Sequence, residues 1–332
     1  MTEYISTYIT GLGNVVKNRL ITDLPGAKVI RVFDGLIYYK YDGNFNDLKR
    51  IIYLNNTFCV MKVYKGNQLD FKVMVNKCIK GRQQFLINKG TFRVRFSREN
   101  QFVKVDRNVT QNAEKSIQGN SCLRLDRVNP TTEIWYIIRS EGMGFFCQLL
   151  FKRKVTEKKL NKGELRPEFS NLMCSCITLN KDMIICDPFC GYGAISKQLI
   201  TRFNVKKVYA SDLDKEKVDL IKKSKWSENK KIKVFHANAM KLKEIADSTV
   251  DAVITDPPWG YYEQIDDMKD FYKEMLKELN RIVKENGKIV ILTARKEEFE
   301  SSCIDLGISI SKKYDTLVNG KKASVYVFSN LK

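Results

Sequence analysis

From residue 163 onward, short apolar runs alternate with stretches in which apolar residues recur every three or four positions. Short apolar runs bounded by turn residues are typical of buried strands, and the three-to-four spacing is typical of amphipathic helices. The runs predict strands over 183–189, 206–213, 231–239, 250–258 and 287–294, with helices over 197–203, 214–226 and 266–284. This alternation predicts an α/β fold with a doubly wound parallel sheet.

Turn residues mark how this part of the chain ends. The helix predicted over 266–284 carries a stripe of apolar residues, and we expect Asn286-Gly287 to end it. The last stretch, 316–330, consists of two apolar runs around Asn319-Gly320. Asn-Gly between two such runs predicts a β-hairpin.

The first 153 residues show a different pattern, in which predicted strands follow one another with few helices between them. Strands over 4–10, 27–41 and 57–65, with helices over 14–21 and from Asn46, predict a small α+β domain over 1–65. Further strands, with helices over 69–80 and 107–117, predict a second α+β domain over 66–153. The basic segment 154–166 is then a linker to a last domain over 167–332.

Charge separates the two halves of the chain. The protein has 332 residues and a formal net charge of +20, of which +16 lies in the first 162 residues. A lysine-rich solvated surface would spread the excess evenly, whereas this uneven distribution favours binding to a polyanion such as nucleic acid. The residues we expect to contact phosphate are Arg93, Arg95 and Arg98 on the predicted strand 91–99, and Lys152, Arg153 and Lys154 at the start of the linker. For the three arginines of the strand, a solvated strand face is nearly as good an explanation.

The remaining composition excludes several classes. A hydrophobic content of 43% excludes a disordered chain, and no apolar run approaches the roughly 20 residues needed to span a membrane. Nine cysteines, an odd number, and a start without signal-peptide features predict a reduced, cytoplasmic protein. The single histidine, His236, disfavours Ser-His or Cys-His catalysis, and no cysteine spacing here matches a zinc site.

Three strand ends carry candidate ligand-binding residues. Asp187 starts the sequence DPFCGYG, whose Gly191 and Gly193 would let the backbone approach a nucleotide-like ligand, although such a turn is also found as a simple tight connection. Asp212 ends the next strand, where an acidic residue suits ribose hydroxyls, and Asn238 ends the one after, where an amide suits an adenine edge. An aspartate at this point could instead cap the following helix, a role that suits Asp214 better than Asp212.

The sequence TDPPWG after the fourth strand is the most specific motif. Two prolines, Pro257 and Pro258, stiffen a backbone that would aim the Asp256 carboxylate, a peptide carbonyl and the Trp259 ring at one point. The carboxylate and the carbonyl would accept the two hydrogens of an exocyclic amine while the ring stacks on its base. This arrangement favours a pyramidal nitrogen that attacks an electrophilic methyl group in line. A merely rigid Pro-Pro loop is the alternative.

These motifs together resemble those of the THUMP-domain guanine-N2 RNA methyltransferases. The similarity runs from Leu165-Arg166-Pro167 through DPFCGYG, SDLD, ANA and TDPPWG. The sequence CLRLDRVNPTTEIWYIIR is similar to the closing half of a THUMP domain, and 1–65 resembles the ferredoxin-like domain that precedes it. The resemblance implies a Rossmann-like class I S-adenosylmethionine-dependent methyltransferase domain over 167–332, preceded by ferredoxin-like and THUMP domains.

The same resemblance implies roles for the site residues. Asp256, Pro257, Pro258 and Trp259 would hold the target guanine; Asp187, Gly191 and Gly193 would line the methionine side of S-adenosylmethionine; Asp212 would bind its ribose and Asn238 its adenine. The chain departs from the family pattern at four positions. Family members usually have Ser, Thr, Glu and Tyr there, whereas this chain has Tyr192, Ala194, Gln198 and Trp259, in the same order.

We therefore hypothesise that the protein is an enzyme that methylates the 2-amino group of a guanosine in structured RNA. The favoured RNA is tRNA, and the first two domains would bind it. An adenine-N6 or cytosine-N4 methyltransferase on RNA or DNA is the first alternative, because DPPW suits any exocyclic amine. A non-catalytic RNA-binding protein with a methyltransferase fold is the second. The sequence does not indicate an activating subunit, the target nucleotide or the number of methyl groups transferred.

Overall fold

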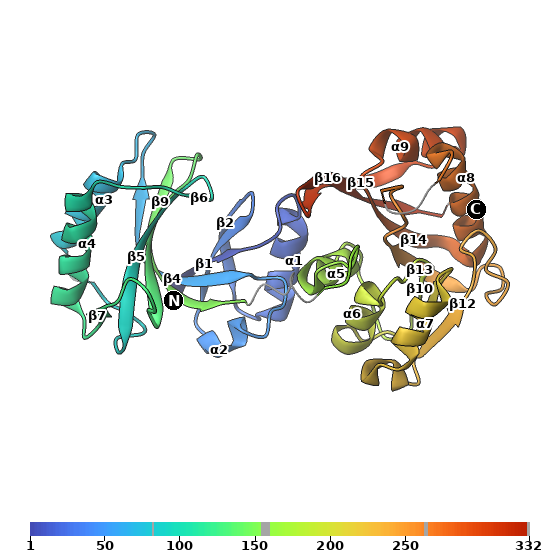
Figure 1. Cartoon of the computed structure of the whole chain (residues 1–332), viewed down its shortest axis with the longest axis horizontal. Coiled ribbons are helices and arrows are strands. Elements are labelled where there is room, and N and C mark those ends of the chain that lie inside the picture. Colours follow the sequence, from blue (N-terminus) through green and yellow to red (C-terminus); the bar gives the residue numbers. More distant parts are fainter. Residues whose placement is uncertain (82, 154–159, 262–264, 331–332) are drawn as a thin grey trace. The chain divides into compact units, whose positions relative to one another are not determined.

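A computed structural model describes residues 1–81, 83–153, 160–261 and 265–330. The chain divides into two compact units (Figure 1). The first comprises Met1–Tyr8 and Leu20–Lys154, and the second comprises Ile9–Arg19 and Val155–Lys332. Each unit has its own sheet and its own core.

The first unit is built on one sheet in the order β2-β3-β1-β4-β9-β8-β5-β6, with β7 beside β5. Its strands are β1 (Thr2–Thr7), β2 (Lys28–Phe33), β3 (Leu36–Tyr41), β4 (Asn56–Lys65), β5 (Thr91–Arg98), β6 (Gln101–Phe102), β7 (Arg124–Leu125), β8 (Thr132–Ile138) and β9 (Met143–Lys152). Its helices are α2 (Phe45–Leu48), α3 (Phe71–Ile79) and α4 (Arg107–Asn120). Most of helix α1 (Gly13–Asp23) falls in the second unit.

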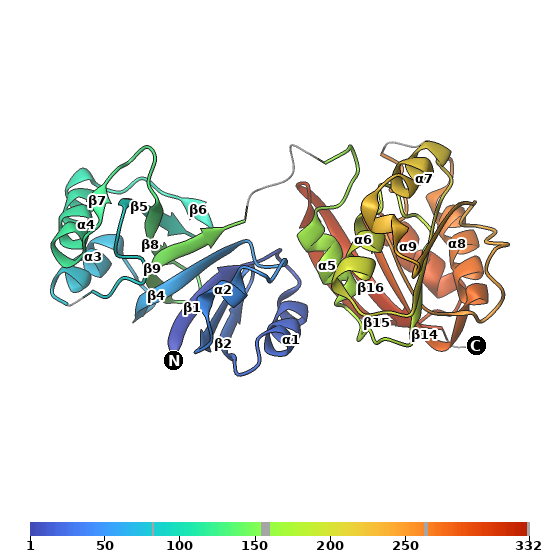
Figure 2. The ribbon, with the colours of Figure 1, turned by 90° about the horizontal axis from the view of Figure 1, so that it is seen from below.

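A continuous sheet joins the two α+β domains predicted in this unit. Strand β4 closes the first predicted domain, yet it pairs antiparallel with β9 of the second, from Asn56 opposite Lys152 to Lys65 opposite Met143 (Figure 2). Helices α3 and α4 cover part of the sheet through a core that contains Phe92, Tyr136 and Phe146. The division into ferredoxin-like and THUMP domains stays a prediction.

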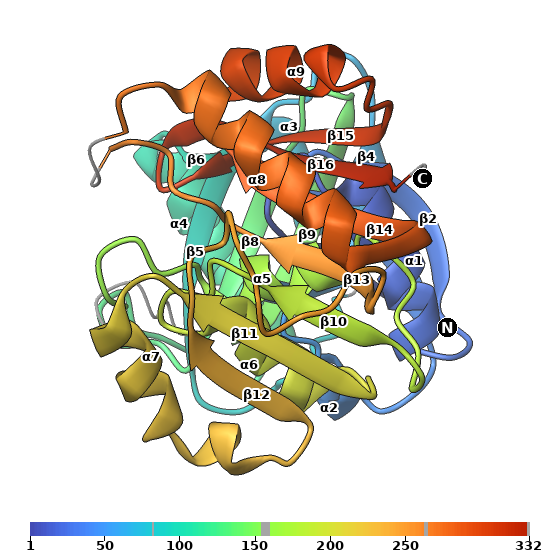
Figure 3. The same cartoon turned by 90° about the vertical axis from the view of Figure 1, so that its right-hand side faces the viewer.

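The second unit contains a sheet in the order β12-β11-β10-β13-β14-β16-β15 (Figure 3). Its strands are β10 (Ile184–Asp187), β11 (Lys207–Asp212), β12 (Ile232–His236), β13 (Val250–Thr255), β14 (Val283–Thr293), β15 (Ile310–Val318) and β16 (Lys321–Ser329). Its helices are α5 (Pro167–Cys174), α6 (Ala194–Arg202), α7 (Lys215–Lys222), the short 3-10 helix Lys225–Glu228, α8 (Met268–Ile282) and α9 (Lys296–Asp305).

The strand directions confirm the predicted doubly wound α/β class. Strands β10 to β14 are parallel neighbours, and β16 lies antiparallel between β14 and β15. After β10 the chain first builds β11 on one side and later β13 on the other, so the order reverses at β10. In open α/β sheets ligands bind at the carboxyl ends of the strands around such a reversal.

Aspartate caps decide where several helices begin. The Oδ1 of Asp214 accepts hydrogen bonds from the backbone N–H groups of Glu216 and Lys217 at 3.0 and 3.3 Å, and Asp267 does the same for Lys269 and Asp270 at 2.8 and 3.0 Å. An N-cap carboxylate satisfies N–H groups that have no partner inside the helix. The capping alternative therefore holds for Asp214.

Three predictions of secondary structure were wrong or incomplete. Helix α8 ends at Ile282, and Asn286-Gly287 lies inside β14, where the register with β13 shifts between Val283 and Lys288. Asn286 has φ 59°, so the pair forms an irregularity within a strand rather than a helix end. Helices α5 and α9 were not predicted. Nearly every residue of α5 is buried, so it lacks a polar face, and α9 buries only Phe299, Ser302 and Cys303.

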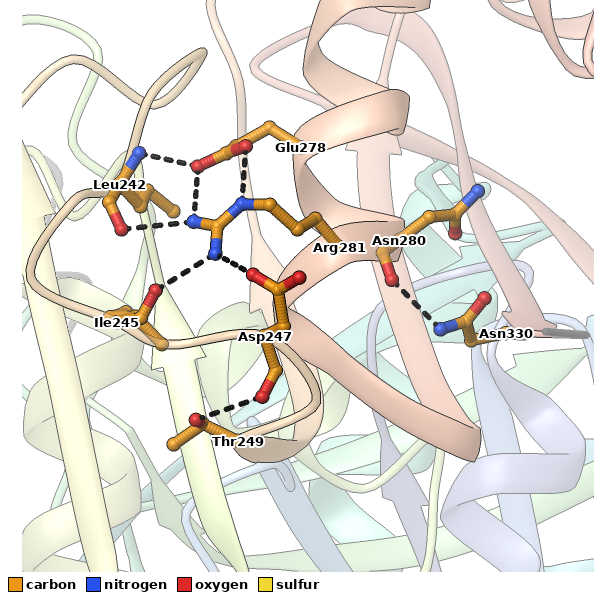
Figure 4. A network of polar contacts seen from close by, with 8 residues as sticks. All are labelled: Leu242, Ile245, Asp247, Thr249, Glu278, Asn280, Arg281 and Asn330. Atoms are coloured by element: carbon orange, nitrogen blue, oxygen red, sulfur yellow. Dashed lines mark hydrogen bonds and ion pairs between the residues drawn. The ribbon is translucent and has the colours of Figure 1, made fainter.

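Arg281 fixes the segment that connects β12 to β13 (Figure 4). Its guanidinium donates to the carbonyl oxygens of Leu242 and Ile245 at 3.0 and 3.1 Å and to Asp247 Oδ1 at 2.6 Å. Glu278, one turn earlier on α8, accepts from Arg281 Nε at 2.9 Å and from the Leu242 N–H at 2.5 Å. These bonds join α8 to the loop that follows Asn238.

We expect Arg281→Met to lower the free energy of unfolding by about 2–4 kcal/mol, because two part-buried carbonyls lose their donor and Glu278 loses its cation. Urea unfolding followed by circular dichroism measures the loss. Lys277→Met is the matched control, since the Lys277–Glu274 pair is exposed on the same helix and should change stability by less than about 1 kcal/mol. Equal losses would contradict the role assigned to Arg281.

Candidate active site

A cavity of about 860 Å³ lies at the carboxyl ends of the parallel strands in the second unit. Its wall is formed by the loops after β10, β11, β12 and β13, by residues Lys162–Leu165, and by the β15–β16 hairpin. Its volume falls in the range of small-molecule and cofactor sites. The cavity therefore occupies the edge of the sheet at which the sequence places its candidate ligand-binding residues.

Asp187 lies behind the wall of this cavity. Its side chain is fully buried and accepts hydrogen bonds from Ser196 Oγ on α6 and Thr255 Oγ1 on β13, both at 3.0 Å. Burial raises the pKa of Asp187 to about 7, against the effect of the two hydroxyl groups. Asp187 is not among the residues that line the cavity. It thus joins β10, α6 and β13, whereas the resemblance implied a place beside the ligand.

The two glycines of the loop after β10 have different positions. Gly191 lines the cavity at φ 51°, and its N–H donates to Asp212 Oδ2 at 2.7 Å. Gly193 is the N-cap of α6 at φ 83° and lies against Trp226, such that a Cβ there would be 2.7 Å from the indole ring. A positive φ together with close packing explains why glycine occupies position 193.

Asp212 and Asn238 both line the cavity. The Asp212 carboxylate accepts from the N–H groups of Gly191 at 2.7 Å and Asp214 at 3.0 Å, so it ties the loop after β10 to the loop after β11. Asn238 is exposed, and its Oδ1 accepts from the Met240 N–H at 2.9 Å. Recognition of a ligand by Asn238 would therefore fall to its amide nitrogen.

The TDPPWG segment forms the wall after β13. Trp259 Nε1 donates to Asp256 Oδ1 at 3.0 Å, and both side chains line the cavity together with Pro257 and Pro258. Burial raises the pKa of Asp256 well above its ordinary value and the charge of Asp187 raises it further, while the indole hydrogen bond lowers it. The structure thus brings the carboxylate and the ring together, as the motif predicted.

Tyr261 and Lys321 of this wall, and Arg295 beside it, were not predicted. Arg295 Nε donates to the Trp259 carbonyl oxygen at 2.9 Å, and its guanidinium lies 5.2 Å from the centre of the Tyr261 ring. Lys321 Nζ lies 3.2 Å from the centre of the same ring. Arg295 and Lys321 come from the α9 start and the β15–β16 hairpin, far from the motif in sequence. The Asn-Gly turn predicted the hairpin, but no local signal places its tip at the cavity.

The departures from the family pattern also take definite places. Tyr192 and Ala194 line the cavity, and Lys217 Nζ lies 5.8 Å from the centre of the Tyr192 ring. Gln198 is buried away from the cavity, where its Oε1 accepts from Asn171 Nδ2 at 3.2 Å. Gln198 therefore contributes to the packing of α5 against α6.

The arginines of β5 bond to the protein itself. Arg93 Nε donates to Glu133 Oε1 at 2.7 Å, Arg95 lies 5.1 Å from the centre of the Phe102 ring, and Arg98 Nη2 donates to the Leu69 carbonyl at 3.1 Å. These contacts favour the structural explanation of the strand 91–99, and binding of phosphate by its arginines stays a prediction. All three residues would have to exchange or share these contacts to bind RNA.

The residues predicted at the start of the linker differ from one another. Lys152 is exposed at the end of β9. Arg153 donates to the carbonyl oxygens of Leu54 at 3.1 Å and Ile51 at 2.5 Å, so it closes the turn before β4. Lys154 lies outside the described residues.

Four cysteines that lie close together in the sequence are buried, and burial raises the pKa of their thiols: Cys174, Cys176, Cys186 and Cys190. In the described ranges, no group of three or more His, Cys, Asp or Glu side chains could hold a metal ion. The described helices also include none long and apolar enough to cross a membrane.

Comparison with known proteins identifies the family. Residues 154–324, which contain every wall of the cavity, match the model of the RMKL-like methyltransferase domain. The chain belongs to this family. Its RMKL-like domain accounts for the second sheet and for the position of the motifs on it.

Individual relatives agree with this assignment. The chain is 28% identical over 152 residues to a tRNA (guanine(10)-N2)-dimethyltransferase from Methanocaldococcus jannaschii, a match that covers 43% of this chain and 41% of that protein. The chain thus spans about two fifths of the length of this relative.

Two solved structures share the fold over nearly the whole chain. TrmN from Thermus thermophilus superposes with a TM-score of 0.78 at 18% identity and covers all of both chains. A protein described as a predicted N6-adenine-specific DNA methylase from Listeria monocytogenes superposes at 0.68 with 16% identity, over 98% of this chain and 96% of that one. These likenesses extend the fold assignment to the first unit.

Proposed function

We propose that this RMKL-like methyltransferase transfers a methyl group from S-adenosylmethionine to the exocyclic 2-amino group of a guanosine in tRNA. The observation that carries the proposal is the Asp256–Trp259 pair on the wall of a cavity formed by the loops after β10, β11 and β12. The same cavity thus has a place for a nucleotide-like cofactor and, next to it, a place for a planar base. When bound, S-adenosylmethionine supplies the electrophilic methyl group.

The residues after β10, β11 and β12 fit the cofactor. The Gly191 turn allows a close approach of the backbone, and the Asp212 carboxylate, fixed by two N–H groups, faces the cavity where it would accept from ribose hydroxyls. Asn238 would recognise the adenine edge. Tyr192 and Ala194 replace the hydroxyl residues usual in the family, so the methionine end would rely on other groups of this wall.

Asp256 and Trp259 fit the amine-bearing base. The indole N–H holds Oδ1 of Asp256, which leaves Oδ2 in position to accept a hydrogen of the amine, and the indole face stacks on the ring. Held in this way, the amine nitrogen would direct its lone pair at the methyl group that bound S-adenosylmethionine supplies. The Asp256 carboxylate, or water, would take up the surplus proton of the methylated amine. The raised pKa of Asp256 makes it a competent acceptor.

One observation favours guanine in tRNA as the target, and a second favours a nucleic acid as the substrate. The relative with 28% identity is named as a tRNA guanine-N2 methyltransferase. The residues up to 162 carry +16 of the net +20, which suits a folded RNA. By resemblance, the first unit would bind the acceptor end of the tRNA, and we propose that the enzyme acts in the cytoplasm. An adenine or cytosine target remains the alternative because Asp256 and Trp259 fit any exocyclic amine.

Transfer of a labelled methyl group tests the substrate class. The full-length protein is incubated with methyl-labelled S-adenosylmethionine and either bulk tRNA or duplex DNA, and acid-precipitable label is counted. We expect label in tRNA alone. Label in DNA would favour the alternative enzyme, and a protein that binds neither S-adenosylmethionine nor its demethylated product in calorimetry would be a non-catalytic RNA-binding protein.

The pH dependence of kcat tests the hydrogen bond between Trp259 and Asp256. Transfer requires the ionised carboxylate, so kcat should fall as pH drops through the raised pKa of Asp256. Trp259→Phe keeps a stacking ring but removes the N–H that lowers this pKa. The variant should therefore lose activity at a higher pH than the wild type. An unchanged pH profile with a lower kcat would mean that the indole serves only for stacking.

A further inference from the structure

Thr255 places a buried hydroxyl group between the loops after β10 and β13. It is the last residue of β13 and immediately precedes Asp256. Its side chain is fully buried and is not among the residues that line the cavity. The three residues before it, 252–254, are buried and apolar. A hydroxyl at the end of such a run needs hydrogen-bond partners, because it has no access to water.

The Thr255 hydroxyl has a partner on each side. It donates to Asp187 Oδ1 at 3.0 Å, and it accepts from the Phe189 N–H at 3.3 Å. Asp187 ends β10, the parallel neighbour of β13, and Phe189 lines the cavity at the start of the loop that leads to Gly191. Because a hydroxyl has only one hydrogen, these bonds form a directed chain from the Phe189 N–H through Thr255 to the Asp187 carboxylate.

We infer that Thr255 is a positioning residue whose hydroxyl holds the loop after β10 at a fixed distance from Asp256. The inference rests on the proposed function, in which that loop lines the cofactor and Asp256 accepts from the target amine. One hydroxyl would thus set the separation of methyl donor and methyl acceptor without touching either. Transfer depends on this separation, and a misplacement of about 1 Å can slow a reaction about 10²-fold.

Ser196 provides a matched control for the pairing of the Asp187 carboxylate. Ser196 is fully buried on α6, and its hydroxyl donates to Asp187 Oδ2 at 3.0 Å, the same distance as that from Thr255 to Oδ1. The Ser196 backbone N–H also bonds to this carboxylate. Both hydroxyls therefore stabilise a buried carboxylate, but that of Ser196 belongs to α6 and not to the segment that carries Asp256.

Three variants of the full-length protein separate these roles. Thr255→Val keeps the shape of the side chain and removes the hydroxyl, Thr255→Ser keeps the hydroxyl, and Ser196→Ala removes the other hydroxyl from Asp187. Single-turnover transfer to tRNA is measured with saturating S-adenosylmethionine at pH 8, where Asp187, with a pKa of about 7, is ionised. We expect Thr255→Val to slow transfer by about 10–10²-fold and the other two variants to stay within about threefold of the wild type.

Binding constants show whether the loss lies in the chemical step. In Thr255→Val the Kd values for S-adenosylhomocysteine and for tRNA should each change by less than about threefold, because each loop keeps its own contacts with its ligand. Thermal melting shows that the variants are folded. If Thr255→Val alone does not fold, Asp187→Asn/Thr255→Val is compared with Asp187→Asn, since loss of both partners costs less than loss of one. The added valine should still slow transfer about tenfold.

The indole N–H of Trp259 gives a readout that needs no methyl transfer. The chain has three tryptophans, Trp135, Trp226 and Trp259, and therefore three indole signals in proton–nitrogen NMR spectra, of which Trp259→Phe identifies that of Trp259. Since this N–H donates to Asp256 Oδ1 at 3.0 Å, its signal follows the position of Asp256. Thr255→Val should move the Trp259 signal and leave that of Trp135 unchanged, whereas Thr255→Ser should move neither.

The proposal is overturned if Thr255→Val transfers methyl groups at the wild-type rate or leaves the Trp259 signal unmoved, because the hydroxyl would then serve stability alone. It is also overturned if Ser196→Ala slows transfer as much as Thr255→Val does, since the effect would then belong to the Asp187 carboxylate. Failure of the proposed function is distinct: the wild type would transfer no methyl group to tRNA, and the Trp259 signal would still decide the role of Thr255.

Discussion

Asp256→Asn should lower the single-turnover rate of methyl transfer to tRNA by about 10²–10³-fold, the usual cost of removing one preorganised polar group from a reacting centre. The amide keeps the size of the carboxylate and leaves an oxygen that can accept from Trp259 Nε1. It loses the negative charge that draws the amine hydrogens and the ability to take up a proton. The loss should therefore appear in the chemical step and leave assembly of the site intact.

Binding of tRNA separates this explanation from a general disruption. The Kd for tRNA of Asp256→Asn should stay within about twofold of the wild type, because the carboxylate makes one hydrogen bond among the many contacts expected over the basic first unit. Asp256→Ala should abolish transfer with the same small effect on the Kd. Parallel losses of transfer and binding would contradict the division of work between the two units.

Gly193→Ala should destabilise the second unit by about 2–5 kcal/mol. Position 193 has φ 83°, which costs an alanine about 1–2 kcal/mol, and the new Cβ would lie 2.7 Å from the Trp226 ring, which adds an overpacking cost of about 1–3 kcal/mol. Urea unfolding monitored by tryptophan fluorescence measures the change. The variant should also bind S-adenosylmethionine more weakly, because Gly193 is the N-cap of α6, which follows the loop after β10.

Gly191→Ala is the control that isolates the contact with Trp226. Gly191 has φ 51°, yet nothing lies within 4 Å of a Cβ built there. The Gly191→Ala variant should therefore be destabilised only by the conformational cost of about 1–2 kcal/mol. If both variants lose the same stability, backbone strain alone explains position 193 and the packing against Trp226 contributes nothing.

The parallel strands and their ends could be predicted because they are short, apolar and followed by chemistry-bearing residues. Strands β10 and β13 are almost wholly buried, and the motifs that end them, with Asp187 and Asp256, meet at one edge as parallel strands require. The capping role of Asp214 was likewise readable from its position before an amphipathic helix. Local pattern and local chemistry agree in these segments.

The features that escaped prediction depend on contacts between distant segments. Helix α5 is buried on nearly all sides, so no periodic polar face marks it. Asn286-Gly287 has the composition of a helix end, but pairing of β14 with β13 makes it an irregularity within a strand. Arg295 and Lys321 reach Tyr261 only because the strand order brings α9 and the hairpin to the cavity.

The candidate phosphate ligands were also misjudged because their contacts come from distant segments. Arg93 and Arg95 alternate along β5 as in a nucleic-acid-binding strand, and Arg98 follows three positions later, yet each contacts a neighbouring protein group. Net charge indicates which half of the chain attracts a polyanion, whereas the individual arginine that binds it depends on which carboxylates and carbonyls the fold places nearby. Glu133, forty positions from Arg93, could be matched to it only through the pairing of β5 with β8.

The chemical identity of the methyl acceptor tests the central claim most directly. Unmodified tRNA transcript is incubated with the full-length protein and S-adenosylmethionine whose methyl group carries deuterium, and the RNA is digested to nucleosides for mass spectrometry. The account predicts that the deuterated methyl group is found on N2 of guanosine and is absent from the digest of the Asp256→Asn reaction. Deuterated methyl on adenosine N6 or cytidine N4, or on no nucleoside, would contradict it.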